Sequence, residues 1–91
     1  MDWQIKILPE FTKKLQSEKP DVKKGVLEKI FSVLPNTEYK DKPLKGKLST
    51  LCSLHYSKYR IIYEIDETNH VKTVLTLGFR KDIYRKMNRK I

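Results

Sequence analysis

The sequence predicts an α+β fold with the element order βααβββ(α), in which two N-terminal helices pack on one face of an antiparallel sheet of 3–4 strands. Three observations support this prediction. Several short segments alternate apolar residues with other residues, which is the period of a β-strand. Two segments in the N-terminal half carry apolar residues at helical spacing, and a proline stands near the start of each. Short polar turns separate the last three strands, which favours antiparallel pairing.

The N-terminal half contains the first strand and both helices. Residues 3–8, "WQIKIL", alternate as a strand does. Residues 9–18 predict a short helix, and residues 19–35, "KPDVKKGVLEKIFSVLP", predict a longer one with a broad apolar stripe. Gly25 lies inside the second helix, where glycine costs about 1 kcal/mol relative to alanine. We therefore expect Gly25 to permit close packing against the first helix.

The C-terminal half is predicted to be mostly sheet. Residues 35–47 form a polar connector rich in lysine and proline. Gly78 is expected to break the last strand, and the basic tail after it is expected to form one or two helical turns. The three strands are predicted at residues 51–56, 59–65 and 71–77.

Composition limits the possible functions. The 91 residues predict one domain over 1–91, with a net charge of +9 from 20 Lys and Arg against 11 Asp and Glu. This excess is typical of a protein that binds a polyanion or an acidic protein, although it is also found in proteins that are simply lysine-rich. The single Cys52 forms no internal disulfide and fits a reducing, cytoplasmic location. The sequence contains no metal-ligand spacing, no signal peptide and no apolar run of the roughly 18 residues that a membrane span needs.

Arg60 is the most informative cation, because it lies inside the predicted strand "YRIIYEI". The period of two places Arg60 on one face of the strand and its neighbours Tyr59 and Ile61 on the other. The Arg60 face is the sheet face that two helices cannot cover. Ser53 and His55 of the preceding strand are expected on that same face. Arg60 has two interpretations: a solvated surface cation, or a guanidinium placed to bind a phosphate.

Further basic and aromatic residues are expected to reach this face. Tyr84 lies at helical spacing from the cations that follow the last strand, and it could donate a hydrogen bond or stack on a base. His55 could transfer a proton near neutral pH. Solvated charge and core packing are the alternative interpretations of these side chains. The cations in question are Arg80, Lys81 and Arg85 in the tail and Lys45 and Lys47 in the connector.

Three segments in this order resemble the RelE/ParE toxin superfamily of bacterial and archaeal toxin–antitoxin pairs. They are "IKILPEFTKKLQ", "PLKGKLSTLCSLHYSKYRIIYEID" and "VLTLGFRKDIYRKM". The resemblance implies a toxin that cuts messenger RNA in the ribosomal A site through attack of the RNA 2′-hydroxyl, without a metal or other cofactor. It also implies an acidic RelB-like antitoxin as partner in a heteromeric complex. Arg60 and Arg80 take the family's phosphate-stabilising positions, and Tyr84 takes that of its C-terminal tyrosine.

The chain also departs from the family pattern. Ser53 and His55 stand where relatives usually carry basic residues directed at the substrate, and Phe79 stands where many have histidine. His55 could replace the missing acid or base, and Lys45 or Lys47 could supply charge. Two alternatives therefore remain open: a ParE-like poison of DNA gyrase, or a non-catalytic member that binds nucleic acid or the antitoxin.

Overall fold

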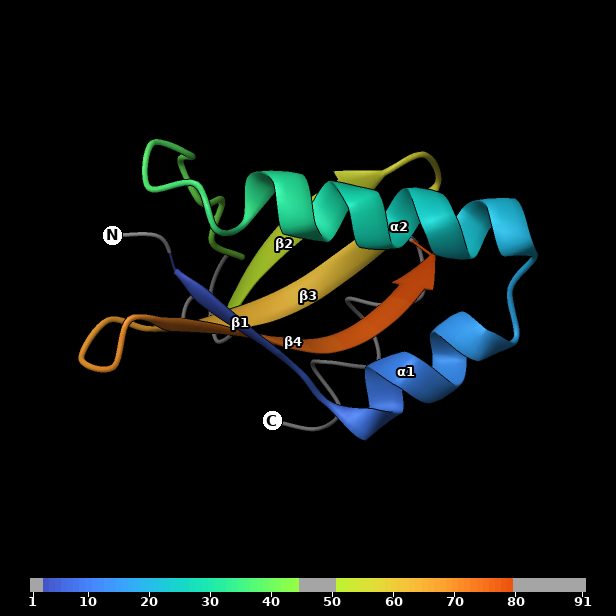
Figure 1. Cartoon of the computed structure of the whole chain (residues 1–91), viewed down its shortest axis with the longest axis horizontal. Coiled ribbons are helices and arrows are strands. Elements are labelled where there is room, and N and C mark those ends of the chain that lie inside the picture. The colour runs from blue at the N-terminus through green and yellow to red at the C-terminus, as the bar shows by residue number, and fades with distance from the viewer. Residues whose placement is uncertain (1–2, 45–50, 80–91) are drawn as a thin grey trace.

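The computed structural model describes residues 3–44 and 51–79 (Figure 1). It contains the predicted order of two helices and four strands. No helix within these residues is long and apolar enough to cross a membrane. The elements are β1 (Gln4–Ile7), α1 (Pro9–Gln16), α2 (Pro20–Val33), β2 (Leu51–Tyr56), β3 (Tyr59–Asp66) and β4 (Val71–Phe79).

The four strands form one sheet in the order β1-β4-β3-β2. β2, β3 and β4 are antiparallel neighbours, as their short turns predict. β1 instead pairs with β4 in parallel, from Gln4 opposite Val71 to Ile7 opposite Val74, so the α+β fold is confirmed with a mixed sheet. A tight hairpin forces antiparallel pairing, whereas most of the chain separates β1 from β4 and leaves their direction to the packing of the helices.

Local sequence explains most element ends. Both helices begin at a proline, whose missing N–H would have no helical partner at that position. α1 ends where the Ser17 hydroxyl donates to the Lys14 carbonyl at 2.8 Å. The predicted break at Gly78 is wrong, because β4 continues to Phe79 and Gly78 pairs with Arg60.

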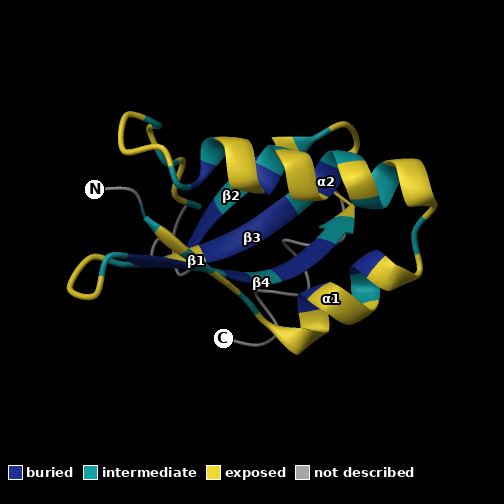
Figure 2. Cartoon of the chain, in the orientation of Figure 1, coloured by how far each residue is buried: buried dark blue, intermediate teal, exposed yellow. Residues whose placement is uncertain are grey.

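The main core lies between the helices and one face of the sheet (Figure 2). The outer surfaces of both helices are exposed, whereas β3 and β4 are largely buried. Burying one such aliphatic or aromatic side chain stabilises the fold by roughly 1.5–3 kcal/mol. The side chains with no exposed surface include Phe11 of α1, Val26 and Ile30 of α2, and Ile61, Tyr63 and Val74 of the sheet.

The opposite face of the sheet is only partly open. Ile62 is fully buried there beside Leu51, and both pack with Leu44 and Leu75. The expectation that this whole face meets solvent or a ligand is therefore wrong around Ile62. The Leu44 N–H donates to the Leu51 carbonyl at 2.8 Å, which carries the connector along β2 and brings an apolar side chain to this cluster. Open surface remains nearer the β2–β3 turn, at His55.

Gly25 packs against Tyr56 of β2, not against α1 as expected from the sequence. A Cβ atom at Gly25 would lie 1.9 Å from the Tyr56 Oη and 2.5 Å from its Cζ. We expect Gly25→Ala to lower the free energy of unfolding, because the clash outweighs the gain in helix propensity of about 1 kcal/mol. In a Tyr56→Ala background, where the clash is gone, Gly25→Ala should instead raise the free energy of unfolding by about 1 kcal/mol. Urea unfolding of the four variants measures both effects, and equal effects in the two backgrounds would contradict this packing.

Candidate functional site

Arg60 and His55 are direct cross-strand partners. The register of β2 and β3 places His55 opposite Arg60 and Ser53 opposite Ile62. Partners in an antiparallel pair point to the same face, with Cβ atoms about 5 Å apart. The structure therefore brings together on one face the three strand residues that the sequence had grouped: Ser53, His55 and Arg60.

These three residues line a pocket of about 440 Å³ at the edge of the sheet, here called the edge pocket. β2 is one of the two edge strands, and its side chains reach the pocket from both faces, with Leu54 contributing from the core side. Among the described residues that line it, none is acidic. The lining residues are Lys29 and Val33 of α2, Tyr39 and Lys42 of the connector, Ser53, Leu54 and His55 of β2, and Arg60 of β3.

Sequence reasoning missed Lys29 and Lys42. Lys29 lies in the second predicted helix with no role expected for it, and nothing in the connector indicated that it would run beside β2. The structure shows that the Ser53 N–H donates to the Lys42 carbonyl at 3.1 Å, which fixes this connector backbone against the strand. The edge pocket thus collects three permanent cations and one histidine, an arrangement suited to phosphate oxygens.

Backbone contacts restrain the Arg60 and His55 side chains. The Arg60 Nη1 donates to the Tyr59 carbonyl at 3.3 Å, and the guanidinium stays half-exposed. The His55 Nε2 contacts the Ser57 carbonyl in the tight turn between the strands. The buried Tyr59 donates through its Oη to the Glu18 Oε1 at 2.6 Å, so the start of β3 is tied to the loop between the helices. This hydrogen bond raises the pKa of Tyr59, which stays a neutral donor at physiological pH.

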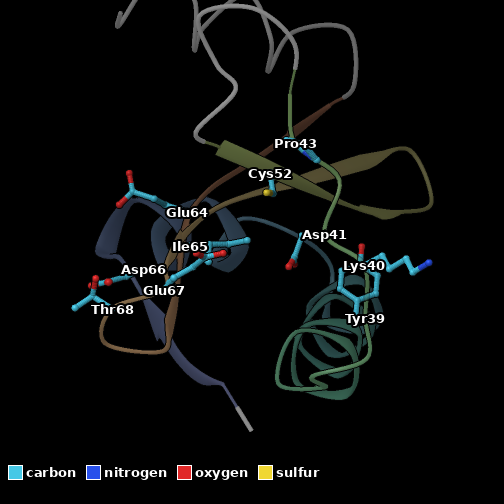
Figure 3. A pocket seen from close by; sticks show the side chains of 10 residues that line it. All are labelled: Tyr39, Lys40, Asp41, Pro43, Cys52, Glu64, Ile65, Asp66, Glu67 and Thr68. Atoms are coloured by element: carbon cyan, nitrogen blue, oxygen red, sulfur yellow. The ribbon is translucent and has the colours of Figure 1, made fainter. Parts of the chain in front are cut away.

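A second pocket, of about 850 Å³, has the opposite charge (Figure 3). Connector residues including Asp41 line one side, and the end of β3 with the following turn lines the other, with Glu64, Asp66 and Glu67. Side-chain and backbone hydrogen bonds from Asn69 lower the pKa of Asp66, which keeps that carboxylate charged. Such carboxylates repel a phosphate, so the two ends of β3 differ in charge and only the Arg60 end suits an anion.

Beneath the connector lies a fully buried lysine, Lys72, which the sequence analysis did not single out. Its Nζ lies 2.9 Å from the Asp41 Oδ1 and 5.1 to 5.9 Å from the ring centroids of Trp3, Tyr39 and Tyr63. The Tyr63 Oη donates to the same Asp41 oxygen, and burial together with this hydrogen bond raises the pKa of Tyr63. This charge cluster anchors the connector that supplies Tyr39 and Lys42 to the edge pocket.

The remaining predicted site residues lie outside the described part of the chain. Within the described ranges, no group of three His, Cys, Asp or Glu residues could hold a metal ion. The roles of the undescribed residues stay predictions. These residues are Lys45, Lys47, Arg80, Lys81, Tyr84 and Arg85.

The fold and the edge pocket define a small α+β protein with a cluster of basic side chains at one edge of its sheet. Residues 5–84 match the family model described as "ParE toxin of type II toxin-antitoxin system, parDE". The chain therefore belongs to this family, within the RelE/ParE toxin superfamily, and is the toxin of a type II toxin–antitoxin pair. A search of curated protein sequences gave no significant match.

Solved structures of RelE toxins share the fold. The RelBE2 toxin–antitoxin complex from Mycobacterium tuberculosis matches with a TM-score of 0.77 and 21% identity, over 88% of this chain and 100% of that chain. A mutant of the Escherichia coli toxin RelE in the free state matches with a TM-score of 0.77 and 17% identity, over 100% and 99%. The archaeal RelE–RelB complex from Pyrococcus horikoshii matches with a TM-score of 0.66 and 24% identity, over 88% and 97%.

Proposed function

We propose that this toxin is a metal-independent endoribonuclease that cuts messenger RNA in the ribosomal A site. The observation that carries the proposal is the pairing of Arg60 with His55 in a pocket whose described lining contains no acidic residue. An arginine provides a permanent charge for the phosphate, and a histidine provides a ring nitrogen that can accept or donate a proton. Arg80 and Tyr84 complete the proposed site, as the family resemblance implies.

The proposed reaction needs only groups that the RNA and the protein supply. The 2′-hydroxyl of one nucleotide attacks the adjacent phosphorus, forming a bond from O2′ to phosphorus. The bond from phosphorus to O5′ then breaks, leaving a 2′,3′-cyclic phosphate and a free 5′-hydroxyl. Arg60 and Arg80 stabilise the charge on the phosphorane. Of His55 and Tyr84, one accepts the proton that the 2′-hydroxyl loses, and the other donates a proton to the leaving O5′.

We also propose an acidic, RelB-like antitoxin as the partner and the cytoplasm as the location. The chain carries a net charge of +9, and Phe31 on the outer side of α2 is 53% exposed, close to Leu27 at 36%. An acidic amphipathic partner would neutralise the charge and cover this apolar surface, which stabilises the bound toxin. The similar proteins from M. tuberculosis and P. horikoshii were solved as complexes with antitoxins.

A ParE-like action on DNA gyrase is the second candidate. The family model that matches is that of the ParE toxin, and the chain has Ser53 and His55 where RNA-cutting relatives usually carry basic residues. Lys29 and Lys42 replace some of that charge from outside the sheet, which favours the RNA-cutting function. A gyrase poison would cause DNA damage and leave messenger RNA intact.

Expression of the toxin alone, followed by mapping of messenger RNA 5′ ends, distinguishes the two functions. We expect new 5′-hydroxyl ends within translated codons, which disappear when translation initiation is blocked. In a purified translation mixture, toxin that was stripped with EDTA and then freed of it should cut as fast as untreated toxin, because no protein-bound metal takes part. Intact messenger RNA together with trapped gyrase–DNA complexes would assign the second function instead.

A further inference from the structure

Two cations of the edge pocket, Lys29 and Lys42, come from outside the sheet. Lys29 lies on α2 and Lys42 on the connector, whereas Arg60 and His55 lie on neighbouring strands. We infer that Lys29 and Lys42 form a second phosphate-binding position, which holds the RNA strand beside the nucleotide that is cut. This inference rests on the proposed RNA-cutting function. It makes the edge pocket a binding site for a segment of single-stranded RNA.

The position of the pocket favours a polymer over a single nucleotide. β2 is an edge strand, and the residues that line the pocket come from both of its faces, with His55 on one and Leu54 on the other. A ligand that fills the pocket therefore passes over the edge of the sheet, from the Arg60 face toward α2. An RNA strand has phosphates at regular spacing. When one of them contacts Arg60, a neighbouring phosphate can therefore contact the two lysines.

The surroundings of the two lysines also favour an anion as ligand. Neither Lys29 nor Lys42 forms an ion pair with another described residue, in contrast to Lys72, which pairs with Asp41. Lys29 is half-exposed and shares one small pocket with the Arg60 guanidinium. Like charges in such a space repel one another, and a bound phosphate relieves that repulsion.

The backbone of both lysines is already held in place before any ligand binds. Lys29 lies in the C-terminal half of the 14-residue helix α2, and the Lys42 carbonyl accepts the Ser53 N–H. The neighbouring Asp41 is anchored by Lys72. Binding an anion therefore requires ordering of the lysine side chains only, which keeps the entropic cost of binding low.

The test compares two charge-matched double variants of the full-length chain. Lys29→Gln/Lys42→Gln removes the proposed position, and Lys13→Gln/Lys24→Gln removes two exposed lysines that do not line the pocket. The probe is a ten-nucleotide RNA with 2′-O-methyl groups, which binds but cannot be cut. A single-stranded ligand contributes a slope of about 0.7 in log K against log salt per neutralised phosphate. We expect the pocket variant to lose about tenfold in affinity and about 0.7 in slope, the value for one phosphate, and the control to change less than threefold.

A shorter probe and an acidic peptide complete the test. On a dinucleotide with a single phosphate, the pocket variant should bind like the wild type, because the second position stays empty. Equal losses in both double variants, or a wild type that does not bind the ten-nucleotide probe, would overturn the inference. A pocket variant that binds RNA normally and loses only binding to an oligoglutamate peptide would assign these lysines to a protein partner. If binding behaves as expected while ribosome-bound messenger RNA stays uncut, the proposed reaction fails and the strand-binding site stands.

Discussion

Replacing Arg60 with alanine is expected to lower the rate of messenger RNA cutting by about 10²–10³-fold, because a preorganised donor to the transition-state charge contributes that much. The side chain is half-exposed and outside the core cluster, so the variant should fold normally. Single-turnover cutting of messenger RNA on programmed ribosomes measures the rate, and thermal unfolding confirms the fold. The effect should fall on the chemical step, with ribosome binding changed far less.

Two further substitutions sharpen the interpretation of Arg60. Arg60→Lys keeps the charge and loses the planar fork, so it should recover only part of the activity. Lys58→Ala removes a neighbouring cation from the same hairpin, where Lys58 lies over the rings of Tyr59 and Phe79, and should leave the rate within a few-fold of wild type. A fully active Arg60→Ala toxin would refute the assignment of this residue. A variant that still kills cells without cutting RNA would support action on gyrase.

Replacing Asp41 with alanine is expected to lower the free energy of unfolding by about 3–5 kcal/mol, the usual cost of leaving a buried charge without its partner. Lys72 has no exposed surface, and Asp41 is the carboxylate paired with it at 2.9 Å. Tyr63 loses its acceptor in the same variant. The free energy of unfolding of a native protein is usually only about 5–15 kcal/mol. Much of the Asp41→Ala protein should therefore unfold in mild urea.

A second substitution separates the charge effect from simple loss of packing. In Asp41→Ala/Lys72→Met no charge remains to be compensated, and most of the lost stability should return. Glu38→Ala removes an exposed carboxylate from the same connector and should change the free energy of unfolding by less than about 0.5 kcal/mol. If Asp41→Ala unfolds at the same urea concentration as Glu38→Ala, the buried pair does not stabilise the connector.

Local pattern was sufficient to predict most of the fold. A period of two along Tyr59–Asp66 identified β3 and its two faces, because alternation on a strand is a geometric consequence of the pleat. A two-residue turn then fixed the register that brings His55 opposite Arg60. Both helix starts followed from proline, which is favourable at the first helical position. Each of these predictions depends only on residues that are near one another in the sequence.

Features that depend on distant contacts were not predictable in this way. Lys72 resembled an ordinary polar residue of a strand, and its burial depends on Asp41 and three aromatic rings from other parts of the chain. Lys42 reached the edge pocket through a backbone hydrogen bond that no motif indicates. The buried state of Ile62 followed from the path of the same connector.

The parallel pairing of β1 with β4 has a consequence for synthesis of the toxin. Gln4 pairs with Val71, so β1 waits during synthesis for a strand that is made much later. Pairing over so long a separation requires closure of a large loop, which slows folding relative to local contacts. A nascent chain that ends before Val71 leaves β1 without a neighbour and β3 without one of its two partners. The four-stranded sheet is therefore complete only after β4 has been made, so a chain that lacks β4 has neither the β1 pairing nor the full β3 pairing.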